Sequence, residues 1–200
     1  MFIEKKKIGI TPFKIFLSTC GIFYVWFLPI LSEIGFAEPN STSISEFIAN
    51  PPATGAMSAI SFMPLTIMWE YQDFIITKQS PGYNGLYYSI SLFQFFYGCF
   101  LICTESYAPL WLHATTVVLF GLGFIIHSVM ILIYIETSKL ARISLVIGIL
   151  AFTSLLVVEG MWFWAMECVG FTSLLLFTPI EWYNMKIEND LNILLSENTL

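Results

Sequence analysis

Charged residues are scarce in this chain. They make up 11% of its 200 residues, whereas apolar residues make up 57% and aromatic residues 17%. A soluble domain of this size has about one quarter charged residues, which cover its surface. This composition therefore predicts an integral membrane protein. Residues 1–200 leave room for a single transmembrane domain and no separate soluble one.

Signatures of several function classes are also missing. The sequence has neither the G-x-S-x-G of serine hydrolases nor the G-x-x-x-x-G-K that holds phosphates. It has no basic patch for nucleic acid, and its two histidines have no cysteine nearby, so we expect neither a metal nor another cofactor. All four cysteines fall in apolar stretches, where we expect buried thiols rather than disulfides: Cys20, Cys99, Cys103 and Cys168.

Six apolar runs are long enough to cross a membrane as helices. They cover approximately residues 8–31, 56–76, 86–104, 110–135, 142–158 and 161–183. The pattern predicts an all-α, polytopic membrane protein with six transmembrane helices. Pro64 interrupts the second run, and only Glu159 and Gly160 separate the last two. A five-span arrangement therefore remains an alternative.

The basic residues predict the topology. With six spans and a cytoplasmic N-terminus, the cytoplasmic segments are 1–7, 77–85, 136–141 and 184–200. All eight Lys and Arg residues lie in these segments or at the adjoining ends of spans, as the positive-inside rule requires. Both termini are then cytoplasmic, with a short polar tail from about residue 184. The opposite side carries the loop 32–55 with Asn40-Ser41-Thr42, where we expect N-glycosylation of Asn40.

The histidines lie fourteen residues apart in the run 110–135. His113 is near its non-cytoplasmic end, and His127 is about 21 Å deeper on nearly the same helical face. Gly121 and Gly123 between them predict the close approach of a neighbouring helix. One interpretation is that each imidazole only bonds across a helix interface. The other places His113 at the level of a lipid head group and His127 in a buried polar contact.

Glu167 is the carboxylate with the most apolar surroundings. It lies in WAMECVGF, about 9 Å from the non-cytoplasmic end of the last run. A carboxylate at that depth is costly unless it is protonated or paired, so we expect a partner such as His113 or a hydroxyl group. Glu167 and His113 are therefore the candidate catalytic acid and base, and Glu33 is a further candidate for lipid contact.

Five segments carry a resemblance to a known family. They are FLPILSEIG, PPATGAMSAISF, LHATTVVLFGLGFIIH, WAMECVGF and EWYNMK, which follow one another over nearly the whole chain. Together they resemble the Frag/DRAM/Sfk family of six-span membrane proteins. The histidine pair and the Glu167 position are similar to the branch that remodels the lipids of GPI anchors. FLPILSEIG is similar to the autophagy-modulator branch.

The resemblance implies a protein that handles lipids, with an expected role in GPI-anchor lipid remodelling. The alternatives are a non-enzymatic modulator of autophagy or lipid signalling, and a channel or proton-coupled transporter that uses the buried His and Glu residues. The implied partners are membrane lipids, including GPI anchors or phosphoinositides, and other membrane proteins. The implied location is the Golgi, endoplasmic reticulum or lysosome, with the plasma membrane as an alternative.

Overall fold

A computed structural model describes residues 12–60, 83–104, 107–134, 137–176 and 180 of the chain. This part consists of helices and short connections, with no strand within it. The helices are α1 (Pro12–Glu33), α2 (Ile44–Phe47), α4 (Tyr83–Ile102), α5 (Leu110–Tyr134) and α6 (Lys139–Ser154). Residues 51–60 and Met161–Leu176 are also helical. The predicted all-α class is confirmed for this part.

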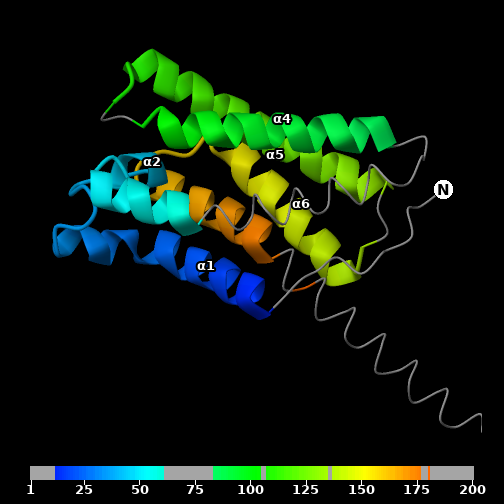
Figure 1. Cartoon of the computed structure of the whole chain (residues 1–200), viewed down its shortest axis with the longest axis horizontal. Coiled ribbons are helices and arrows are strands. Elements are labelled where there is room, and N and C mark those ends of the chain that lie inside the picture. Colours follow the sequence, from blue (N-terminus) through cyan, green and yellow to red (C-terminus); the bar gives the residue numbers. More distant parts are fainter. Residues whose placement is uncertain (1–11, 61–82, 105–106, 135–136, 177–179, 181–200) are drawn as a thin grey trace, which may run out of the picture.

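The long helices lie side by side and alternate in direction (Figure 1). The connections after α1, α4 and α6 all lie at the same end of the bundle, where α2 is found. We call residues 34–50 the cap, and this end of the bundle the cap end. Such an up-and-down arrangement is what consecutive spans joined by short loops produce.

Three helical stretches within the described residues are long and apolar enough to cross a membrane. They are Ile15–Glu33, Gly85–Ile102 and Leu110–Tyr134, and they match the first, third and fourth predicted runs. The fifth run corresponds to α6, which has 16 residues, and the sixth to the shorter apolar helix Met161–Leu176. Most of the run 56–76 and the tail from residue 184 lie outside the described residues. Three of the six predicted spans are thus confirmed as candidates by length and composition.

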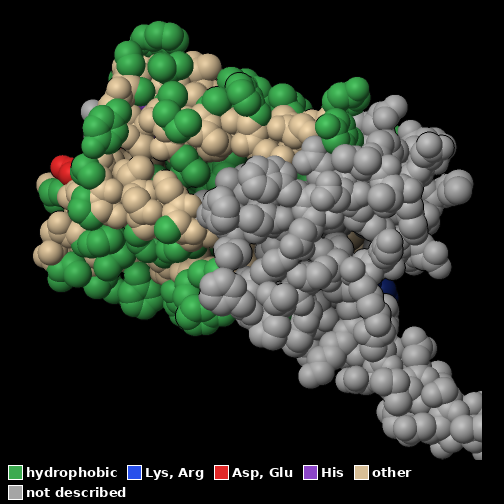
Figure 2. Space-filling view, in the orientation of Figure 1, with side chains coloured by type: hydrophobic (Ala, Val, Ile, Leu, Met, Phe, Trp, Pro, Cys, Tyr) green, Lys and Arg blue, Asp and Glu red, His purple; other side chains and the backbone are tan. Residues whose placement is uncertain are grey.

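The outward faces of the helices are apolar. On α6 the exposed apolar positions are Leu140, Ile143, Val146, Ile147 and Leu150, and the other exposed positions are Lys139 and Arg142 in its first turn and Thr153 near its end. The buried positions of the same helix are small or polar as well as apolar: Ala141, Ser144, Leu145, Gly148, Ala151 and Phe152. Figure 2 shows apolar side chains over much of the described surface of one face. This pattern is the reverse of a soluble helix, and it is compatible with an integral membrane protein.

Helix packing relies on close approach at small residues. On α5, a Cβ added to Gly123 would lie 3.2 Å from the Cα of Phe93 on α4, which confirms the predicted close approach there. Ser144 on α6 and Ser173 on the helix Met161–Leu176 each donate a side-chain hydrogen bond to the other's carbonyl. Small residues let these backbones come together, and each serine satisfies its hydroxyl within the pair.

Candidate functional site

The cap is folded by its own polar residues. Ser43 caps α2, because its hydroxyl accepts a 3.1 Å hydrogen bond from the main-chain N–H of Glu46. The N–H of Glu38 donates to the carbonyl of Phe47 at 3.0 Å and closes the loop. Asn40 adopts a left-handed conformation with φ of 59°, which asparagine tolerates better than most residues. These bonds fix the cap as a compact unit rather than a free loop.

The underside of the cap is apolar and buried against the helices. Its buried apolar residues are Ala37, Ile44, Phe47, Ile48 and Ala49. Each large apolar side chain of this set contributes about 1.5–3 kcal/mol when it leaves water, which is enough to keep so short a segment docked. The cap therefore closes its end of the bundle.

Glu167 links the cap to the helix Met161–Leu176. Its carboxylate is 6% exposed, and Oε2 accepts a hydrogen bond of 2.5 Å from the main-chain N–H of Ile44. Ile44 is the first residue of α2, so its N–H has no partner within that helix. We expected a donor such as His113 or a hydroxyl group; the observed donor is the main chain of the cap.

Aromatic residues surround this link. Trp164, one helical turn before Glu167, has edge contacts with Trp26 of α1 and Phe47 of the cap at centroid distances of 5.7 and 6.3 Å. The indole Nε1 of Trp164 is buried and has no hydrogen-bond partner among the described residues. Cys168 donates its thiol to the carbonyl of Val25 at 3.4 Å. The helix thus joins α1 and the cap at the same level.

Two consecutive hydrogen bonds connect His127 to α4. Its Nδ1 lies 3.1 Å from the hydroxyl of Ser89, and that hydroxyl donates to the carbonyl of Leu86 at 2.9 Å. Because the single proton of Ser89 is used on this carbonyl, Nδ1 of His127 must be the donor in the other bond. The ring also stacks on Phe93 with an interplanar angle of 13°. His127 is therefore a buried polar contact between helices, which both interpretations of the sequence predict.

His113 bonds to the other end of α4. Its Nδ1 lies 2.6 Å from the carbonyl oxygen of Cys103, the residue that follows α4. A carbonyl oxygen can only accept, so Nδ1 carries the proton of this bond, and Nε2 is the ring nitrogen that the bond does not use. His113 is only 4% exposed. It lies within the protein rather than on an open surface, and the two imidazoles attach α5 to both ends of α4.

The predicted acid and base do not share a hydrogen bond. Glu167 bonds to Ile44, His113 to Cys103 and His127 to Ser89, so these contacts form three separate links. Glu33 is an exposed residue at the end of α1, and Asn40 is exposed on the cap. Within the described part of the chain, no group of three potential metal-binding side chains comes together.

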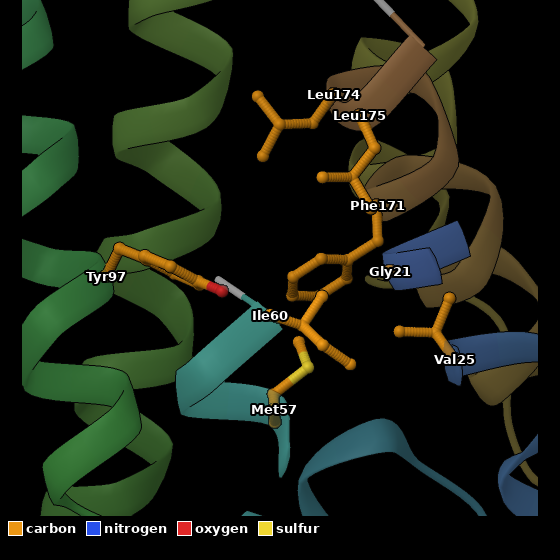
Figure 3. A pocket seen from close by; sticks show the side chains of 8 residues that line it. All are labelled: Gly21, Val25, Met57, Ile60, Tyr97, Phe171, Leu174 and Leu175. Atoms are coloured by element: carbon orange, nitrogen blue, oxygen red, sulfur yellow. The ribbon is translucent and has the colours of Figure 1, made fainter. Parts of the chain in front are cut away.

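A narrow pocket lies between α1, α4, the helical residues 51–60 and the helix Met161–Leu176 (Figure 3). It is lined by Gly21, Val25, Met57, Ile60, Tyr97, Phe171, Leu174 and Leu175, and the hydroxyl of Tyr97 points toward Ile60 and Phe171. Its volume is about 10 Å³, close to the minimum for one water molecule. The walls are apolar, so this pocket provides no set of polar groups for chemistry.

The cap was the main feature that the sequence reasoning missed. The apolar residues Ile44, Phe47 and Ile48 in an otherwise polar loop, with Ser43 before them, were the signal that could have predicted it. Searches of protein-family models, curated proteins and solved structures give no match to this chain.

Proposed function

We propose that this chain is a multi-pass membrane protein that handles lipids and acts in GPI-anchor lipid remodelling. The proposal rests on one arrangement: a buried carboxylate, Glu167, lies beneath a folded cap at the end of an apolar bundle. A lipid has a polar head group and apolar chains, and it would place both at this boundary between the cap and the apolar bundle. The sequence resemblance to the GPI-remodelling branch of the Frag/DRAM/Sfk family supports this choice of lipid.

His113 is the residue through which chemistry is best tested. Its Nδ1–H is used by Cys103, so any acid or base function belongs to Nε2. Asparagine places an N–H donor near the position of Nδ1 and has nothing at the position of Nε2. His113→Asn therefore separates the packing role from the chemical role, which His113→Ala does not.

The experiment is performed in cells that lack the native protein. GPI-anchor lipids are analysed by mass spectrometry after expression of the wild-type chain, His113→Asn or His113→Ala, with abundance measured by immunoblot. We expect deletion to change the lipid composition and the wild-type chain to restore it. His113→Asn should accumulate close to the wild-type level and still fail to restore the lipids. Unchanged lipids after deletion would refute the remodelling proposal.

A second candidate function is a non-enzymatic modulator of autophagy or lipid signalling that binds partners. One observation favours it: Glu167, His113 and His127 all bond to groups of the protein itself. Residues used in this way stabilise a fold without reacting. Full lipid restoration by His113→Asn would favour this candidate. The three separate links give less support to a transporter, because proton relay needs consecutive donors and acceptors.

A further inference from the structure

The glycosylation sequon of the cap is presented in an unusual way. Asn40 is exposed and has a positive φ of 59°, the only positive φ of a non-glycine residue among those described. It stands in the connection between Glu38 and α2, at the end of the bundle where the long helices turn (Figure 1). The side-chain amide is thus available on the surface, while the backbone around it is held in a tight turn.

The rest of the sequon is bound to the cap. Ser41 is 6% exposed and donates its hydroxyl to the carbonyl of Glu38 at 2.9 Å. Both the main-chain N–H and the hydroxyl of Thr42 donate to Oε2 of Glu46, at 2.5 and 3.0 Å. The threonine hydroxyl is the group at the third position that defines the sequon. In the folded cap this hydroxyl is occupied.

We infer that Asn40 carries an N-linked glycan and that addition of the glycan competes with closure of the cap. A sequon in an extended, unfolded segment offers both its amide and its free threonine hydroxyl, whereas the folded cap offers only the amide. The closing bond from Ile44 to Glu167 joins residues 123 positions apart, so it forms only after the last described helix has been synthesised. Until then only the local contact between Thr42 and Glu46 competes with glycosylation for the threonine hydroxyl. This inference uses the proposed topology but not the proposed lipid function.

The test is translation of the full chain in the presence of microsomes, followed by removal of N-glycans and measurement of the shifted fraction. We expect a partly modified wild-type chain and no modification of Asn40→Gln. Glu46→Ala removes the acceptor of both Thr42 hydrogen bonds and should raise the modified fraction by about twofold or more. Glu46→Gln is the matched control: its amide oxygen still accepts from Thr42, so its modified fraction should stay near wild type.

An insertion variant separates failure of this inference from failure of the topology. A flexible Gly/Ser segment that contains a second sequon is inserted after Pro39. The added length allows the glycosylating enzyme to reach this second sequon. If the inserted sequon is modified and Asn40 is not, the inference is wrong and the topology stands. If neither sequon is modified, both the topology and the inference are wrong. Equal modification of Glu46→Ala and Glu46→Gln would overturn the proposed competition between glycosylation and cap closure.

Discussion

The carboxylate of Glu167 accepts a hydrogen bond of 2.5 Å from the main-chain N–H of Ile44. This bond connects the last described helix to the cap. The bond uses an N–H that the start of α2 would otherwise leave without a partner. An acceptor from a distant helix therefore adds to the local cap that Ser43 provides at the start of α2. Glu167 holds the cap in position whether or not it also takes part in chemistry.

Replacing Glu167 with Leu should destabilise the protein. The change leaves the buried N–H of Ile44 unpaired, which costs about 1–3 kcal/mol. Glu167→Gln keeps the shape and an oxygen acceptor, so it should be close to wild type in stability. Thermal denaturation in detergent, followed by size-exclusion chromatography, measures both variants. A Gln variant as unstable as the Leu variant would contradict the anchoring role.

The variant Glu167→Gln also tests acid–base chemistry at this position. Glutamine cannot ionise, so a Glu167→Gln protein that reaches its membrane and restores GPI lipids would show that the carboxylate neither takes up nor gives a proton. Loss of lipid restoration at normal abundance would instead support the acid–base role. Lipid mass spectrometry together with immunoblotting distinguishes these outcomes.

Replacing His127 with Ala should act through abundance. The variant loses the ring that stacks on Phe93 and leaves the hydroxyl of Ser89 without its donor. A single side-chain hydrogen bond between membrane helices contributes only about 0.6 kcal/mol on average, so most of the loss should come from the missing ring. We therefore expect His127→Asn, which keeps a donor near Nδ1, to recover only part of the abundance. Equal abundance of His127→Ala and wild type would exclude a packing role.

The parts of the fold that follow from periodicity and composition could be predicted. Long apolar runs identified α1, α4 and α5, because each must cover its backbone polar groups in an apolar setting. The spacing of fourteen predicted His113 and His127 on nearly the same face of α5, and both side chains bond toward α4. Gly123 correctly indicated a close helix contact.

The partners of the polar residues could not be predicted, because they come from distant parts of the chain. The donor to Glu167 is 123 residues away, and no local pattern indicates it. We expected His113 at an open boundary, but it is 4% exposed and bonds to the carbonyl of Cys103. Sequence reasoning identified which polar residues need explanation, whereas three-dimensional packing determines what each one contacts.

Gly148→Ala should destabilise the contact between α6 and the helix Met161–Leu176. An added Cβ would lie 2.3 Å from Oγ of Ser173 and 2.9 Å from the Phe124 ring, so these groups would have to move. Overpacking of this kind costs about 1–3 kcal/mol. Gly98→Ala on α4 is the matched control, because a Cβ there meets nothing within 4 Å. Thermal denaturation should show a lower midpoint for Gly148→Ala alone; equal midpoints would contradict this packing.

The cap end should lie on the non-cytoplasmic side, as the one-sided basic residues predict. Exposed aromatic side chains gather near this end: Tyr107 and Trp111 flank the start of α5, and Trp162 lies at the start of the last described helix. Tyrosine and tryptophan prefer the membrane–water boundary, which places these turns at one interface.

We therefore expect an epitope tag at the C-terminus to be digested in sealed microsomes, and a tag inserted in the cap to be protected. Opening the vesicles with detergent supplies the control, since both tags should then be digested. Protection of the C-terminal tag in sealed vesicles would mean an odd number of spans or an inverted chain. The cap tag distinguishes these two cases, because it would be digested in an inverted chain and would stay protected if a later span were missing.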